Sequence, residues 1–371
     1  MRLGKSLPLA VVLSCLAQTG WPQLTNGAGL QSVGAAQAPA SQISIKSSAA
    51  AEPGRLHRSP MQQSPEPAES FGLPLVCDGD GNLYVRTAPD GIQAVHKLNS
   101  KGEKTALFLA NSPTIKVDAG GSFAVTPDGN FYQLVFAHEI TRYVFVYGKD
   151  GSPKSEIKLQ PGFAFTPYKI AVFPNGDLLV SGLEYDKDPK NRAMWPFTGI
   201  FSPDGILRKE LTLEDDQQIH DMGASGDPMV SPPDMPSLNY AVVRGEAEAA
   251  GDGNVYLMRR LSPAIFYAIS PGGSIRRFTV DPGRNDVVPE SMHISGNRIA
   301  ILFWEPQTHE QLMKVIDLEG RALATYYEPA PKEGERPLGL GFACYLQNPE
   351  RFIFLEETEN GGLGLLTATP E

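Results

Sequence analysis

Histidine and carboxylate side chains are the groups in this sequence that could carry acid–base or metal chemistry. The chain has 6 histidines and 42 Asp and Glu residues. Three of the histidines, His138, His220 and His293, are widely separated in the sequence but could converge in the fold, and the nearby carboxylate candidates are Glu248 and Glu290. A histidine beside carboxylates can act as an acid and a base, or it can ligate a metal ion. Such chemistry requires that residues far apart in the sequence converge in the fold.

Sequence motifs of several catalytic families are missing. We find no G-x-S-x-G nucleophile motif, no P-loop, no dinucleotide-binding G-x-G-x-x-G after a strand and no C-x-x-C pair. The sequence therefore completes no catalytic constellation. We leave open whether the protein is an enzyme and favour the interpretation that it is not.

Short motifs that repeat along the chain must position any site. Asp-Gly or Asn-Gly turns followed by β-rich runs occur at 80–85, 128–132, 175–180 and 252–257, with weaker copies at 295–300 and 348–353. The copies begin 43 to 53 residues apart, except for one interval of 77. A constant period of this length indicates a repeat architecture, and the long interval indicates an insertion of about 30 residues.

A second turn follows the first within five of the repeats, as in Asp150-Gly151 and Asp204-Gly205. Two-residue turns of this kind connect antiparallel strands, so each repeat reads as four strands. Helical periodicity is not evident from residue 71 onward. The sequence therefore predicts an all-β fold over 71–371, a six-bladed β-propeller with four-stranded antiparallel blades.

The wording of the repeat adds a family resemblance. Residues 78–85, Asp-Gly-Asp-Gly-Asn-Leu-Tyr-Val, resemble the NHL-repeat propellers and the wider six-bladed group that includes the gluconolactonase-like family. The resemblance covers about residues 72–371 and implies the fold, because the motif is a structural blade turn.

Two members of that group imply a metal. The amidating lyase uses zinc held by histidines, and gluconolactonase-like propellers use a divalent ion held by Glu, Asn and Asp near the axis. The weak candidates here are Glu248, Glu290 and His293, with oxygen ligands suited to calcium and the imidazole to zinc. No well-placed Asn set completes them. We expect no cofactor and keep calcium or zinc as the alternative.

In a propeller, the loops between the second and third strands and those between blades share one face. The insertions 184–196 and 214–246 map to that face. Long loops in compact folds often carry function, although they can also merely cover the surface. The ligand-binding candidates on these loops and nearby strands are His138, Arg142, His220, Arg244, Glu248, Glu290, His293 and Trp304.

Two functional hypotheses follow. The first is an exported binding or scaffold protein that recognises a protein, a peptide or a carbohydrate on its loop-rich face. The alternative is a metal-dependent hydrolase, lactonase-like, or a lyase, with its site at the channel mouth.

Ring closure involves the cysteines and the chain termini. Cys77 and Cys344 lie on the first strands of repeats one and six, which a closed ring makes neighbours. A disulfide between them would close the ring covalently; the alternative is two buried free thiols. The last repeat also lacks a fourth strand, which residues 43–46 could supply.

The N-terminus reads as a targeting segment of an exported bacterial protein. Arg2 and Lys5 precede a short apolar run, so 1–17 reads as a signal peptide. The alternative is a lipoprotein signal, with Cys15 lipidated. Residues 18–70, rich in Ala, Ser, Pro and Gln, read as a disordered linker. Export to the periplasm or the extracellular space follows from either signal.

Charge limits the partners. The formal net charge is −10, and no basic stripe interrupts the acidic body. Binding to nucleic acid or to an anionic membrane surface requires clustered Lys and Arg, so we exclude both. No apolar run after the N-terminus is long enough to span a membrane, although a lipid anchor at Cys15 stays open.

Overall fold

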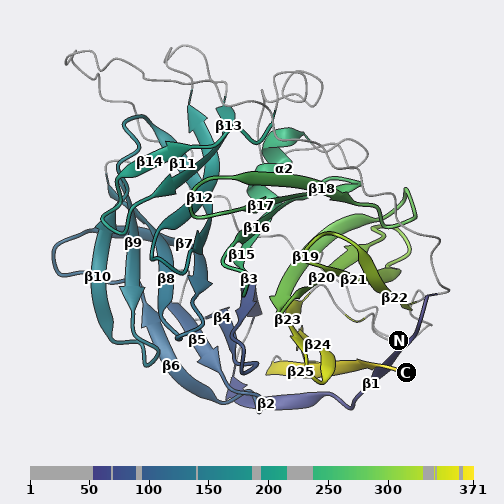
Figure 1. Ribbon diagram of the computed structural model, residues 1–371. Helices are drawn as coiled ribbons and strands as arrows, with labels where there is room; N and C mark the ends of the chain where they lie inside the picture. The colour runs from purple at the N-terminus through teal and green to yellow at the C-terminus, as the bar shows by residue number, and fades with distance from the viewer. Residues whose placement is uncertain are drawn as a thin grey trace, which may run out of the picture. The chain divides into compact units, whose positions relative to one another are not determined.

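The computed structural model describes residues 53–67, 70–88, 94–138, 141–185, 194–214, 237–328, 338, 341–358 and 362–371. The expected signal peptide, the 43–46 segment, Cys15 and His220 lie outside the described residues. The described chain is a six-bladed β-propeller with antiparallel four-stranded sheets, as the repeats predict. Figure 1 shows the first strand of each sheet near the centre of the ring.

The blades follow one another along the chain. Blades 1 to 3 are β3 (Ser70–Cys77), β4 (Leu83–Ala88), β5 (Ala94–Leu98) and β6 (Lys104–Leu109); β7 (Val117–Val125), β8 (Phe131–Ala137), β9 (Arg142–Tyr147) and β10 (Pro153–Lys158); and β11 (Phe165–Val172), β12 (Leu178–Tyr185), β13 (Met194–Phe201) and β14 (Leu207–Glu210).

Blades 4 and 5 are β15 (Glu246–Ala249), β16 (Val255–Arg259), β17 (Ala264–Ile269) and β18 (Ile275–Val280), then β19 (Val288–Ser295), β20 (Arg298–Trp304), β21 (Gln311–Asp317) and β22 (Ala322–Glu328). Blade 6 consists of β23 (Phe342–Gln347), β24 (Glu350–Glu357) and β25 (Gly362–Pro370), completed by β1 (Leu56–Arg58) and β2 (Gln62–Pro67).

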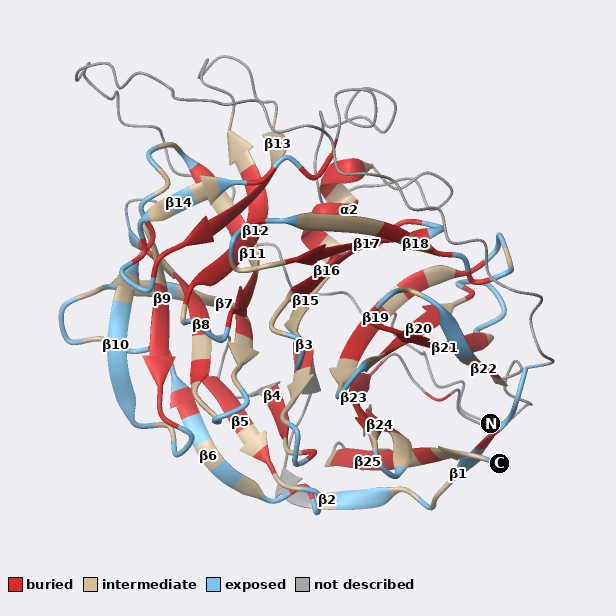
Figure 2. Cartoon of the chain, in the orientation of Figure 1, coloured by how far each residue is buried: buried red, intermediate tan, exposed pale blue. Residues whose placement is uncertain are grey.

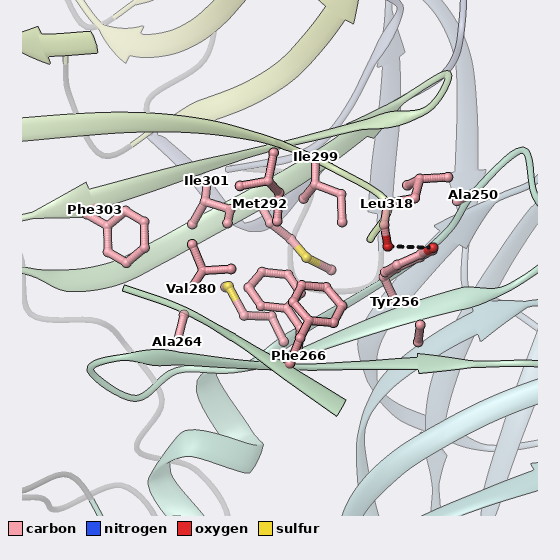
Figure 3. Close-up of a cluster of buried hydrophobic side chains, with 14 of the residues drawn as sticks. Ala250, Tyr256, Ala264, Phe266, Val280, Met292, Ile299, Ile301, Phe303 and Leu318 are labelled. Atoms are coloured by element: carbon pink, nitrogen blue, oxygen red, sulfur yellow. Dashed lines mark hydrogen bonds between the residues drawn. The ribbon is translucent and has the colours of Figure 1, made fainter. Parts of the chain in front are cut away.

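The hydrophobic core lies between adjacent blades rather than at the centre of the ring. Between blades 4 and 5, Phe266 and Phe278 pack with their ring centroids 5.2 Å apart, against Met292, Ile301 and Phe303 of the next sheet. Figure 3 shows this cluster, and Figure 2 shows the middle strands buried and parts of the outer strands exposed. Burying both faces of each middle strand explains why β17 is apolar or aromatic throughout and why β16 is so except for Arg259, which forms an ion pair with Glu214.

The second turn of the repeat brings each blade onto its predecessor. In blade 3, Gly205 has φ of 81°, and a Cβ at this position would lie 2.1 Å from the carbonyl oxygen of Lys158 in blade 2. Only glycine allows both this backbone conformation and this close approach. The Gly of the repeated turn is therefore an inter-blade contact as well as a hairpin signal.

The N-terminal segment completes the last blade, but not through the expected residues. Strands β1 and β2 both pair with β25, as Leu56↔Pro370 and Gln62↔Leu365 register pairs show. Residues 56–67 therefore belong to the propeller, which corrects the expected boundaries of a linker to residue 70 and a propeller from residue 71. The alternating composition of 43–46 predicted that this segment would form the outer strand. In the structure, β1 and β2 pair with the outer edge of β25 instead.

A disulfide joins the first and last blades near the axis. Cys77 of β3 and Cys344 of β23 are bonded, with Cα atoms 5.3 Å apart and a sequence separation of 267. Ring closure therefore has two elements, the covalent bond between inner strands and the β1–β2 strap on the outer edge.

The ring has two distinct ends. Connections between second and third strands and between blades leave from the end that we call the loop-rich end, and the tight turns lie at the opposite end, the turn end. The 214–246 insertion ends in a helix that the sequence did not predict, α2 (Leu238–Arg244). No helix in the described residues has the length and apolarity needed to cross a membrane.

Candidate functional site

Two prolines on innermost strands shape the loop-rich end of the ring. The β11–β12 pairing shifts register between Pro167 and Lys169, and the β19–β20 pairing shifts between Pro289 and Ser291. Proline cannot donate to a ladder, and a bulge redirects the extra residue. The extra residues are Tyr168 and Glu290, both of which take part in the site.

Lys169 lies on β11 just after the first of these bulges. Its side chain is partly buried, and among the described residues only charges at a distance, and no hydrogen bond, act on its amine. Burial is the main reason that the pKa of Lys169 is lowered, to about 8. Glu246 opposes this shift, and repulsion by Arg244 and Arg260 adds to it. An unpaired, desolvated lysine is uncommon in a structural role and marks a candidate functional site.

Helix α2 carries Arg244 to the same place. The side chain of Ser237 accepts a hydrogen bond from the backbone N–H of Tyr240 and starts the helix, which leaves Arg244 in the last turn. The Arg244 guanidinium lies 5.8 Å from the centre of the Tyr240 ring, and its Nε is buried without a hydrogen-bond partner in the described chain. Arg244 therefore keeps a donor free beside Lys169.

Arg260, unlike Arg244, has partners for its guanidinium donors. Its guanidinium forms an ion pair with Glu290, and its Nε donates to the carbonyl oxygen of Pro289 at 2.6 Å. Burial, only partly offset by Glu246, lowers the pKa of Arg260. Its donors are thus directed to the bulge of β19, and its charge adds to that of Lys169 and Arg244.

The two glutamates of β15 bind the neighbouring inner strand. Glu246 accepts a hydrogen bond from the backbone N–H of Met292 at 2.6 Å, and Glu248 accepts one from that of Ile294 at 2.8 Å. The axis-facing edge of an innermost strand has no ladder partner, so these carboxylates satisfy N–H groups that would otherwise lack one. Burial raises the pKa of Glu246, and the nearby positive charges of His293 and Lys169 offset part of that rise.

His293 is enclosed by acceptors on both sides. Its Nδ1 lies 2.8 Å from a Glu248 carboxylate oxygen and its Nε2 lies 3.0 Å from the carbonyl oxygen of Phe342 on β23. Burial works against the charged ring, but Glu248 and the carbonyl outweigh it and raise the pKa of His293. Because both ring nitrogens face acceptors, the geometry favours the imidazolium, which has no lone pair for a metal or a proton.

Arg142 lies at the start of β9, on the loop-rich side of blade 2. Its guanidinium lies 4.8 Å from the centre of the Phe136 ring, and its Nε is buried without a partner among the described residues. Burial lowers the pKa of Arg142, against the smaller influence of Tyr185, Tyr168 and Asp118. The hydroxyl of Tyr185 in turn lies 2.8 Å from that of Thr166. Arginine and tyrosines therefore meet between blades 2 and 3.

Two other predicted residues, His138 and Trp304, make contacts of their own. His138 directly follows β8 and has an exposed side chain, and its backbone N–H donates to the carbonyl oxygen of Lys116. The indole of Trp304 stacks on the His309 ring with centroids 5.6 Å apart. His220 is outside the described residues. Of the eight predicted ligand-binding residues, Arg244, Glu248, Glu290 and His293 come together in one charged network.

The three metal candidates are engaged in two pairs. Glu248 binds His293, and Glu290 binds Arg260. Among the described residues, no group of three or more His, Cys, Asp or Glu side chains is arranged to hold a metal ion. The geometry of these three residues gives no support to a lactonase-like or lyase-like metal centre.

Sequence reasoning missed Lys169 and Arg260. Both are charged residues within or beside strands whose other members are mostly apolar or aromatic, in the segments 165–172 and 255–260. Each could have been found as a charge that interrupts an inner or middle strand of a propeller blade. Proline two residues before Lys169 was a second available signal.

Comparisons with known proteins identify no family. No protein-family model matches the chain, and no curated protein matches it. Among solved structures, it is similar to a protein of unknown function from Bacteroides thetaiotaomicron, at 14% identity and a TM-score of 0.47, covering 85% of this chain and 76% of that one.

Two further solved structures are similar at the same low level. A putative TolB from Agrobacterium tumefaciens is 14% identical, with 70% of this chain and 83% of that chain covered and a TM-score of 0.42. A putative gluconolactonase is 13% identical, with 67% and 74% covered and a TM-score of 0.36. These similarities assign no function to this chain.

Proposed function

We propose that this protein is an exported β-propeller that binds a ligand at its loop-rich end and does not catalyse a reaction there. The observation that carries the proposal is a set of three partly buried cations. Arg142 and Arg244 each have a buried Nε without a partner in the described chain, and no hydrogen bond acts on the amine of Lys169 there. Buried polar groups normally find partners within the protein. A ligand that supplies acceptors would satisfy these donors.

The groups suited to acid–base chemistry support binding rather than catalysis. Glu248 and His293 are bonded to each other and to backbone groups of β19 and β23. A general acid or base needs one face open to the substrate. These residues instead hold neighbouring innermost strands together.

The aromatic groups favour a protein, peptide or carbohydrate ligand. Tyr168 and Tyr185 are partly buried near Arg142 and present ring surface together with hydroxyl groups. Tyrosine and arginine are enriched at recognition surfaces because each combines apolar area with hydrogen-bonding groups.

Export is part of the proposal. It is supported by the basic and apolar N-terminal segment and by the Cys77–Cys344 disulfide, a bond that persists in oxidising compartments. The mass of the mature N-terminus tests it. Cleavage after Ala17 supports plain secretion, a lipid on Cys15 supports a lipoprotein, and an intact N-terminus in the cytoplasm contradicts export.

Arrays of immobilised peptides and glycans, probed with the full exported chain, test the binding function. Arg142 and Lys149 lie at opposite ends of the same β9–β10 hairpin, and the Lys149 side chain is exposed at the turn end. We expect Arg142→Gln to weaken the strongest binders roughly 10-fold, the loss of one charge-assisted hydrogen bond, and Lys149→Gln to leave them unchanged. An array without binders, or equal losses in both variants, would contradict the proposal.

A further inference from the structure

The amine of Lys169 is a cation without a counter-ion on an innermost strand. Its nearest acidic neighbour in electrostatic terms is Glu246, but that carboxylate accepts its hydrogen bond from the backbone of Met292 instead. An ammonium that is partly removed from water and has no acidic partner is destabilised, so such a group calls for an explanation.

Arg244 provides a second free donor beside it. Helix α2, which ends at Arg244, packs against strand β11, which carries Lys169, and the charge of Arg244 acts on the Lys169 amine. Arg260, the third cation, is already bound to Glu290 and Pro289. The unsatisfied donors of this network are therefore an ammonium and one edge of a guanidinium.

The charge of the network sets the charge of what it can accept. Around Lys169 lie the cations Arg244, Arg260 and His293 and the carboxylates Glu246, Glu248 and Glu290. With His293 protonated, cations exceed carboxylates by one among these described groups. One added negative charge would neutralise the network, whereas a dianion would exceed it and face Glu246.

We propose that Lys169 and Arg244 together bind a single carboxylate group of the ligand at the loop-rich end. This inference rests on the proposed binding function and specifies the chemistry of its site. A carboxylate has one charge and two oxygens, which can accept from the ammonium and from the guanidinium edge at the same time. A peptide C-terminus and an acidic sugar share this group.

Matched pairs of ligands test the inference by calorimetry on the full exported chain. The peptide pair is N-acetyl-Ala-Ala with a free C-terminal carboxylate and the same peptide as its amide. The sugar pair is D-glucuronate and D-glucose, and inorganic phosphate provides a dianion. We expect at least one acid to bind and its neutral counterpart to bind roughly 10- to 150-fold more weakly, the range for a hydrogen bond to a charged group.

Variants and pH connect the effect to the two residues. Lys169→Gln and Arg244→Gln should each remove most of the preference for the acid, and Lys101→Gln, an exposed lysine at the turn end, should leave it intact. Because Lys169 loses its proton near pH 8, the affinity of the wild-type chain for the acid should fall above that pH. In Lys169→Gln it should stay level from pH 7 to 9.

Trace acetylation of the wild-type chain provides a test that needs no variant. With acetic anhydride and peptide mapping, the acid should protect Lys169 and leave Lys101 unprotected in the same digest. Equal binding of acid and neutral partners would overturn the carboxylate inference and leave the binding function standing. Tighter binding of phosphate, or binding of neither acid together with unchanged acetylation of Lys169, would also overturn it.

Discussion

Strand β15 has a different relationship with each of its two neighbours at the axis. Toward β19, Glu246 and Glu248 bond to backbone N–H groups, and Glu248 also binds His293, which continues to Phe342 on β23. Toward β11, Lys169 lies near Glu246 without a hydrogen bond in the described chain. We call the contact between two neighbouring innermost strands a joint. The β15–β19 joint has its polar groups satisfied, whereas the β11–β15 joint leaves the Lys169 cation without a hydrogen bond in the described chain.

Charges that hold the ring together can be told from charges available to a ligand by whether their partners belong to the ring. At the β15–β19 joint every named side-chain charge has a partner that also belongs to the ring, so its role is to hold blades together. At the β11–β15 joint the same carboxylate is already committed, and the cost of the unpaired Lys169 is not offset within the described chain. Unsatisfied groups of this kind are where a ligand can contribute most.

The largest expected effect is on the third joint, between β23 and β3. Replacing both cysteines, Cys77→Ser with Cys344→Ser, should lower the free energy of unfolding by about 4–5 kcal/mol, because the bridge closes a very long loop. Urea unfolding measures this. Reduction of the wild-type chain should reproduce the loss, and an unchanged midpoint in both cases would show that the β1–β2 strap suffices for closure.

The next effect compares the two joints of β15 directly. Glu248→Gln should cost about 3 kcal/mol, because it leaves His293, which is 2% exposed, as a buried cation without its counter-ion. Lys169→Gln at the other joint is the matched variant and should cost little. Equal losses in the two variants would remove the distinction between the joints.

The pH dependence of the stability of the wild-type chain tests the β15–β19 joint separately, through His293. The pKa of His293 is raised in the folded state, so the stability it contributes is complete below the unfolded pKa of about 6.5 and is lost as the pH rises through the folded value. This part of the pH dependence should disappear in Glu248→Gln. Its persistence would assign the titration to another group.

A smaller loss of stability is expected at the turn that connects the outer strands of blade 3, where Gly205 contacts blade 2. Gly205→Ala should destabilise by about 2 kcal/mol, since both the positive φ and the carbonyl of Lys158 oppose a Cβ. Gly253 has φ of 86° with nothing within 4 Å of a Cβ, so Gly253→Ala should cost only about 1 kcal/mol. Similar values would mean that the inter-blade contact contributes nothing.

The smallest expected effect is a gain. Lys169→Met should stabilise the protein by about 1 kcal/mol near pH 7, because it removes an unpaired, desolvated charge. The folded pKa of about 8 lies below the unfolded value of about 10.4, so the penalty is complete below pH 8 and vanishes as the pH rises toward 10.4. Thermal melts across this range measure it, and a loss of stability near pH 7 would contradict the role given to Lys169.

Part of the site was accessible from the sequence. The repeat placed Cys77 and Cys344 on neighbouring strands and the insertions at one end of the ring, and those positions led to Arg244, Glu248, Glu290 and His293. It did not indicate which of them pair with each other. Lys169 was missed because it stands in a segment otherwise read as an ordinary inner strand, and Arg260 because it directly follows the mostly apolar strand β16.

The amino-acid sequence by itself determined the six blades, because turn glycines and alternating apolar runs are local signals that repeat with a constant period. It also indicated which residues lie at the loop-rich end, since that follows from strand order. Only the tertiary structure decided that Glu248 satisfies His293 while Lys169 stays unpaired. These contacts join residues 45 or more positions apart and depend on bulges and blade packing that orient each side chain, which no local pattern specifies.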